Sequence, residues 1–258
     1  MDQISILQYN LVYNAFSFAI AVMGAATAFA FFGRSQVGAA YKTALTLSGL
    51  VTLIAFYHYL RIFNSWDASF SVVAGQIKAT GIQFNDAYRY VDWLLTVPLL
   101  LVELILVMRL SPEDTFVRAT KLGVLAAIMV ALGYPGEISA DNTTRWLWWA
   151  AAMVPFLIIV YDLFVGLGAS IAKQPVHARG LVSAARSLTV ISWCFYPIVF
   201  IFPMIGLTGG GAVTAVQVGY TVADIVAKAV FGVLIYVIAM RKSENETHGA
   251  DRLVSTGA

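Results

Sequence analysis

Seven long apolar segments, separated by short polar breaks, follow one another along the chain. Each is close to the roughly 20 residues that an α-helix needs to cross a bilayer. Helices are expected because a bilayer offers no water to satisfy an open backbone. The segments cover residues 7–32, 41–63, 87–109, 115–134, 144–170, 179–206 and 214–240. This pattern predicts an all-α membrane protein, a seven-transmembrane-helix bundle within residues 1–242, followed by a polar tail at 243–258.

The polar breaks carry residues typical of turns and helix ends. Ser111 followed by Pro112 predicts a helix start, with the serine as cap and the proline in the first turn. The Gly-Tyr-Pro-Gly sequence at 133–136 predicts the end of the fourth span, and three glycines at 209–211 join the last two spans. The longer break at 64–86 is predicted to form a short hairpin over the mouth of the bundle.

Composition supports a membrane domain and excludes several other classes of protein. Of the 258 residues, 60% are hydrophobic and 12% are charged, whereas a soluble domain has about 25% charged residues. A net charge of +2 without a basic run gives no sign of a nucleic-acid partner. A single cysteine, Cys194, excludes an internal disulfide and a thiol-based metal cluster, and no metal site is predicted.

The distribution of Lys and Arg predicts the orientation of the bundle. Eleven of the 16 Lys and Arg residues fall on the side of the C-terminus, four fall on the other side, and Lys228 lies inside the last span. Positive charge accumulates on the cytoplasmic side of membrane proteins. The N-terminus is therefore predicted outside and the C-terminus in the cytoplasm.

Lys228 lies near the middle of the last span, with Asp224 one turn earlier on the same helix face. An ionisable residue at this depth costs at least about 2.5–3.5 kcal/mol, so it persists when it is paired or functional. One interpretation is a structural ion pair between helices. The other is a reactive amine that condenses with an aldehyde to a Schiff base, with Asp224 as the counterion.

The third span carries a stripe of polar residues. At 100° per residue, Arg89, Asp92, Thr96 and Glu103 share one face, and Glu103 lies about 16 Å from Asp92 along the axis. Asp92, close to Arg89 and facing a cation, is expected to be ionised. Glu103 lies among leucines and is expected to be protonated, because burial disfavours a charge. An ionised acceptor outside and a protonated donor inside define an outward proton path.

Five segments of the chain together resemble the bacterial proteorhodopsins, a group of microbial (type 1) rhodopsins. They are Ala55–Tyr59, Tyr88–Leu100 with Glu103, Gly133–Glu137, Trp193–Pro197 and Tyr220–Lys228. The resemblance covers essentially the whole chain, and it is specific because residue types, spacing and order agree. It implies a light-driven proton pump, not an enzyme, in the bacterial inner membrane.

The resemblance also implies roles for the charged residues. Lys228 would hold all-trans retinal as a protonated Schiff base, with Asp92 and Asp224 as its counterions and Arg89 stabilising both. Asp92 would accept the Schiff-base proton, and Glu103 would return one from the cytoplasm. Two further residues complete this set of expected functional residues: Thr96 completes the acceptor–threonine–donor pattern, and His58 would hydrogen-bond Asp92.

The resemblance further implies a pocket around the retinal. Its expected walls are Trp93, Leu100, Met129, Trp193, Tyr196, Pro197 and Tyr220, with Leu100 at a position where leucine accompanies green absorption. Ala227 replaces a common asparagine, and Ser17 stands near a position where some members place a tryptophan at the protomer contact. Bulky Trp149 stands where antenna-binding relatives have glycine, which argues against a carotenoid antenna. Membrane lipids and a homo-oligomer, pentameric or hexameric, are the expected partners.

Three other functions remain to be weighed against a proton pump. A sodium or chloride pump on this fold would lack the acidic acceptor, and Asp92 speaks against it. A photosensory rhodopsin, signalling through a transducer, can keep the same lysine and acceptor but usually lacks a carboxylic donor such as Glu103. A light-independent transporter built around the Asp224–Lys228 pair would bind no retinal and would show no visible colour.

Overall fold

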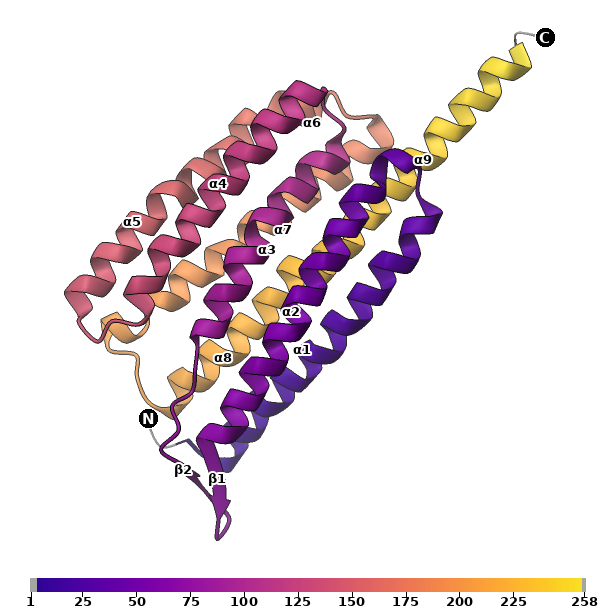
Figure 1. The fold of residues 1–258 in the computed structure, drawn as a ribbon. Helices are drawn as coiled ribbons and strands as arrows, with labels where there is room; N and C mark the ends of the chain where they lie inside the picture. The colour runs from indigo at the N-terminus through magenta and orange to yellow at the C-terminus, as the bar shows by residue number, and fades with distance from the viewer. Residues whose placement is uncertain (1–3, 257–258) are drawn as a thin grey trace.

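The computed structural model describes residues 4–256, with side chains described as far as residue 247. Within that range, seven helical spans are long and apolar enough to cross a membrane. They pack side by side as one bundle, with the N-terminus and a small hairpin at one end and the last helix projecting beyond the other (Figure 1). The predicted seven-helix fold is confirmed. Residues 257 and 258 of the predicted tail lie outside the described residues.

Each of the first four spans is a single helix. They are α1 (Ile6–Gly33), α2 (Lys42–Ser69), α3 (Ala87–Met108) and α4 (Pro112–Glu137). The fifth span joins α5 (Asn142–Tyr161), the π-helical turn η3 (Asp162–Gly166) and α6 (Gly168–Ala172). The sixth is α7 (Val176–Phe200). The seventh joins α8 (Gly210–Asp224), the π-helical turn η5 (Ile225–Val230) and α9 (Phe231–Thr256), so the tail is helical through residue 256.

The two ends of α4 test two of the predicted signals. At its start, the Ser111 side chain accepts a hydrogen bond from the Asp114 amide, and Pro112 occupies the first turn, as predicted. At its other end the predicted stop is wrong, because the helix continues through Pro135 to Glu137. Gly136 serves packing rather than a turn: a Cβ there would lie 3.0 Å from the Phe200 ring and 3.1 Å from Trp148.

Two further boundaries differ from the hydrophobic pattern. Helix α2 runs six residues past its apolar segment, because Trp66 and Ser69 are buried in the bundle and extend the helix. The sixth span ends at Phe200, six residues early, where the chain tightens into a 3₁₀ turn and then reaches Gly206, whose φ of 84° suits glycine. The predicted hairpin is present as antiparallel strands β1 (Phe70–Val73) and β2 (Gln76–Ala79).

Helix α3 is the most enclosed of the spans and positions the polar residues of the bundle interior. Arg89, Asp92, Thr96 and Glu103 are all buried, so the predicted stripe faces the inside of the bundle. The apolar core fills the half of the bundle towards the C-terminal end, where α3 packs against α7 and α9. Glu103 is embedded in this apolar half, whereas Asp92 lies where polar side chains of several helices meet.

Candidate functional site

Lys228 forms the centre of a buried charged cluster. It lies in the π-helical turn η5, a rare local structure that is frequent at functional sites. Its Nζ atom lies 2.6 Å from Asp224 Oδ1 on the preceding turn and 2.7 Å from Asp92 Oδ2 on α3. All three residues are 1–2% exposed. The structure thus brings together the lysine and the two carboxylates that the sequence singled out.

The two carboxylates differ in how many donors reach them. Besides Lys228, Asp224 accepts hydrogen bonds from the hydroxyls of Tyr59 and Tyr196, both at 2.8 Å, and from Trp93 Nε1 at 3.2 Å. Asp92 accepts from Lys228 alone among the described residues, and its Oδ1 has no hydrogen-bond partner there. Asp92 therefore keeps a free acceptor atom beside the lysine, whereas Asp224 is held in place by four donors.

The predicted hydrogen bond between His58 and Asp92 is not formed. His58 Nδ1 lies 4.0 Å from Asp92 Oδ1 and 2.9 Å from the carbonyl oxygen of Ile54, one turn earlier on α2. Because a helical histidine can bond its own backbone in this way, its ring turns from the carboxylate. His58 still borders Asp92, but at 4.0 Å the two side chains form no hydrogen bond.

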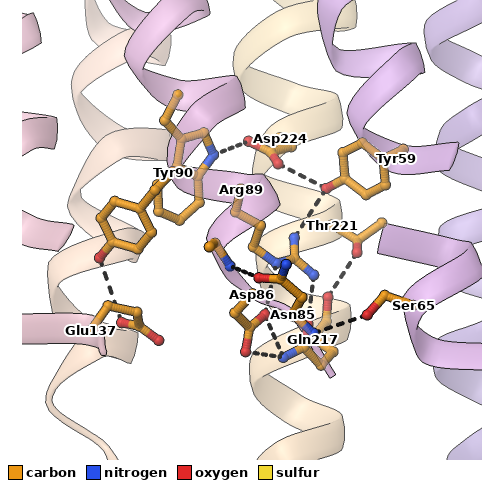
Figure 2. A network of polar contacts seen from close by, with 12 residues as sticks. Tyr59, Ser65, Asn85, Asp86, Arg89, Tyr90, Glu137, Gln217, Thr221 and Asp224 are labelled. Atoms are coloured by element: carbon orange, nitrogen blue, oxygen red, sulfur yellow. Dashed lines mark hydrogen bonds and ion pairs between the residues drawn. The ribbon is translucent and has the colours of Figure 1, made fainter. Parts of the chain in front are cut away.

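Arg89 contacts residues for which the sequence suggested no role. Its guanidinium bonds Gln217 Oε1 at 2.5 Å, contacts the Tyr59 hydroxyl at 3.5 Å and lies 3.5 Å from Asp86 (Figure 2). It bonds neither Asp92 nor Asp224 directly, so any stabilisation of the two carboxylates by Arg89 does not come from a direct hydrogen bond. Helical side chains lean towards the N-terminus, which carries the guanidinium away from Asp92. Arg89 therefore reaches Asp224 through the Tyr59 hydroxyl.

Three residues that bond Asp224, Arg89 or Glu103 had no role assigned from the sequence. Tyr59, Gln217 and Ser48 are all buried in the bundle interior. A weak signal existed for Gln217, a long amide in an apolar helix. Tyr59 and Ser48 are common residue types in spans, and only the packing of α2 against its neighbours shows what they bond.

Glu103 lies on the same face of α3 in a fully buried position. One of its carboxyl oxygens accepts a hydrogen bond from Ser48 on α2, and the other has no partner among the described residues. Thr96 lies between Glu103 and Asp92, and its hydroxyl donates to the Asp92 carbonyl at 2.8 Å. Thr96 thus contacts the backbone of Asp92 rather than its carboxylate.

Glu137, the last residue of α4, lies at the N-terminal end of the bundle. The Tyr90 hydroxyl is 3.5 Å from its Oε2 atom (Figure 2). Arg145 donates to the Glu137 carbonyl oxygen at 3.3 Å. These two contacts place the Glu137 carboxyl beside the polar cluster around Arg89, on the same side of the bundle as Asp92.

An apolar cavity of about 110 Å³ begins at Lys228 and extends among α3, α4, α5 and α7. A single water needs about 10–15 Å³ measured this way, so this is space on the scale of an organic ligand. All the predicted pocket residues line it, namely Trp93, Leu100, Met129, Trp193, Tyr196, Pro197 and Tyr220, together with Lys228. Trp149 also lines it, and its indole donates to the Pro197 carbonyl at 3.0 Å.

Known proteins are similar to this chain in sequence and in architecture. A family model described as bacteriorhodopsin-like protein matches residues 11–242. The green-light absorbing proteorhodopsin of Gamma-proteobacterium EBAC31A08 is 31% identical over 229 residues, covering 87% of this chain and 85% of the relative. The blue-light absorbing proteorhodopsin of Gamma-proteobacterium Hot 75m4 is 32% identical over 226 residues, covering 86% and 84%.

Two solved structures show the same arrangement of helices. Xanthorhodopsin, described as a light-driven ion pump with dual chromophore, superposes with a TM-score of 0.92 and 48% identity, covering 96% of this chain and 99% of that one. Thermophilic rhodopsin superposes with a TM-score of 0.92 and 43% identity, covering 95% and 99%. The match over nearly the whole bundle shows that the chain belongs to the bacteriorhodopsin-like family and is a microbial type 1 rhodopsin.

Proposed function

We propose that this multi-pass plasma-membrane protein is a light-driven outward proton pump, with all-trans retinal bound to Lys228. The observation that carries the proposal is the placement of Lys228. Its amine lies at the wall of an apolar cavity and between two buried carboxylates, one of which has a free acceptor oxygen. The relatives named as proteorhodopsins and as a light-driven ion pump support the same reading.

The residues of the cavity suit retinal. A long apolar aldehyde fits a space lined by aromatic and aliphatic side chains, and the Lys228 amine is the group that can condense with it. The free ammonium of Lys228 stands here for the nitrogen of the protonated Schiff base. When bound, retinal supplies the absorption of visible light and the isomerisation that drives the cycle. Trp93 and Trp193 would line the part of the pocket that takes its polyene chain.

Asp92 is proposed to accept the proton held at Lys228 Nζ. The two groups are already at hydrogen-bond distance, 2.7 Å, which is the geometry that proton transfer requires. Asp92 Oδ1 is unpartnered among the described residues, whereas both oxygens of Asp224 accept from tyrosine hydroxyls. The better-bonded Asp224 is the counterion that remains charged through the cycle.

Glu103 is proposed to return a proton to Nζ from the other half of the bundle. It is buried, has no cationic partner among the described residues, and so is suited to hold a proton at neutral pH. Protons would then pass from Glu103 in the cytoplasmic half of the bundle to Asp92 in the outer half, so transport would run outward. This direction uses the orientation from the Lys and Arg distribution, with the C-terminus in the cytoplasm.

Glu103→Gln tests the donor. The amide keeps the size and the bond to Ser48 but supplies no proton, so return of the proton to Nζ should slow about 100-fold, the usual worth of a general acid. The absorption maximum should stay the same because Glu103 is not among the residues that line the cavity. Flash photolysis measures the recovery, with Glu113→Gln at the exposed start of α4 as the control. An unchanged recovery rate would remove Glu103 from the path.

Two partner questions are part of the proposal. Trp149 fills the cavity wall at the position where a carotenoid would need an opening, and its bond to Pro197 holds it there. We therefore expect no carotenoid antenna.

A homo-oligomer, pentameric or hexameric, is expected from the family resemblance. Size-exclusion chromatography with light scattering would determine its size.

The proposed function is tested by illuminating cells that express the protein with all-trans retinal in an unbuffered suspension. Acidification of the medium that a protonophore abolishes is expected. Alkalinisation would mean that transport runs inward. A coloured protein without any pH change would contradict the pump and favour the photosensory rhodopsin, and a colourless protein would favour a transporter that does not use light.

A further inference from the structure

A second buried lysine, Lys242, lies on α9 near the C-terminal end of the bundle. It is 5% exposed, and its ammonium donates to three neutral acceptors. These are the carbonyl oxygens of Val107 and Met108, at 2.9 and 3.1 Å, and Gln174 Oε1 at 2.8 Å. No carboxylate of a described residue lies within 4.0 Å of it. Glu246, one turn further along α9, acts on it from beyond that distance. A buried charge with no carboxylate in contact is costly, which makes a functional role worth seeking.

The contacts of Lys242 connect three separate parts of the bundle. Val107 and Met108 form the last turn of α3, and Gln174 lies between α6 and α7, directly before the cap residue Pro175. Gln174 is itself buried, and its amide also donates to the Met108 carbonyl at 3.0 Å. We call Lys242, Gln174 and the two carbonyl groups the Lys242 latch. Any separation of the end of α7 from α3 and α9 must break it.

The latch lies directly between Glu103 and the C-terminal face of the bundle. Its carbonyl groups are four and five residues beyond Glu103 on α3, which is about 6–7.5 Å along the axis. The side chains around this stretch are apolar and at most 1% exposed: Leu104, Ile105, Val107, Met108, Ile238 and Ala239. Among the described residues, Glu103 is bonded to Ser48 alone. A proton therefore cannot reach Glu103 from this face until the helices part.

We propose that the Lys242 latch is the gate for proton uptake and must release before Glu103 can be reloaded. The inference rests on the proposed function, in which Glu103 is the donor. Lys242 acts in two ways. Its hydrogen bonds hold α3, α7 and α9 together, and its charge repels a proton that would enter while the latch is closed. It is a positioning residue, since it touches neither the cavity nor the reacting groups.

Helix capping alone does not account for these contacts. A lysine can stabilise the carbonyl groups at a helix end, and Lys242 does so for Val107 and Met108, because Arg109, with φ 53°, bonds the Leu106 carbonyl. The contact with Gln174 lies outside α3, and a lysine that only capped α3 would not need this hydrogen bond. Capping predicts a change in stability, whereas a gate predicts a change in one rate.

Lys242→Met tests the gate because methionine fills a similar volume without charge or donors. In nanodiscs with retinal and a pH-indicating dye, proton uptake after a flash should become about tenfold faster, the rate factor of one charge-assisted hydrogen bond. The absorption maximum and the rate of proton transfer to Asp92 should not change. Arg241→Gln, which removes a charge from an exposed neighbouring position, should leave uptake unchanged.

Gln174→Leu opens the same latch from the α7 side and provides a second variant if Lys242→Met fails to fold. It should also accelerate uptake, and the double variant should be no faster than the faster single one, because both act on one latch. A normal cycle with unchanged or slower uptake in these variants would overturn the gate alone. Absence of a light-driven proton cycle in the unaltered protein would overturn the proposed function and the gate together.

Discussion

Lys228→Ala is expected to abolish visible absorption of the protein supplied with retinal. Among the side chains that line the cavity, Lys228 carries the amine that can form the bond. Retinal would then bind through apolar contacts alone and keep the near-ultraviolet spectrum of the free aldehyde. Absorption spectra of the purified variant, recorded beside those of the unaltered protein, measure the effect. A visible band unchanged in position and height would mean that retinal is held elsewhere.

The alanine variant needs a control for folding. Removal of Lys228 leaves Asp92 and Asp224 buried without their cation, and breaking a buried pair in this way costs about 3–5 kcal/mol. Circular dichroism should establish that the helices remain. Addition of a preformed imine of retinal with a small alkylamine then tests the cavity itself. The return of a visible band would show that the pocket is intact and that only the covalent bond was lost.

Asp92→Asn is expected to reduce light-driven proton transport at least about 100-fold, to the level of cells without the protein. Asparagine has nearly the same shape, so it fills the position beside Lys228, but its amide cannot take the proton. The visible colour should remain because Asp224, with its four donors, still provides a countercharge to Lys228. Illuminated cells with matched amounts of coloured protein provide the measurement.

The control for this variant is Asp114→Asn, which neutralises a carboxylate on the exposed first turn of α4 and should pump normally. Undiminished transport by Asp92→Asn would remove Asp92 as the acceptor. The acceptor role would then pass to Asp224, the second carboxylate at hydrogen-bond distance from Lys228 Nζ.

The buried charges of the bundle interior can be identified from the sequence for a physical reason. Lys228, Asp92 and Glu103 stand out because charges are costly in a bilayer, and helical spacing alone places Asp92 and Glu103 on one face of α3. The span positions follow equally from the length of the apolar segments. The stop expected at Gly-Tyr-Pro-Gly failed because Gly136 is required by the Phe200 ring, a contact between distant segments.

The remaining contacts of the site could not be predicted from spacing. Asp224 takes donors from Tyr59, Trp93 and Tyr196, which come from three different helices, and their meeting depends on how the bundle packs. The hydrogen-bond partners of two further residues depend on their side-chain rotamers. Arg89 extends towards Gln217, and His58 turns to its own backbone, although both lie on the faces that the sequence indicated.

The proposal that light moves a proton to Asp92 is tested most directly by light-induced infrared difference spectroscopy. A positive carboxylic-acid carbonyl band is expected to rise as Lys228 Nζ loses its proton. This band should shift in protein labelled with ¹³C-aspartate and should be missing in Asp92→Asn. A cycle that transports protons without such a band, or one in which the band persists in Asp92→Asn, would contradict the claim.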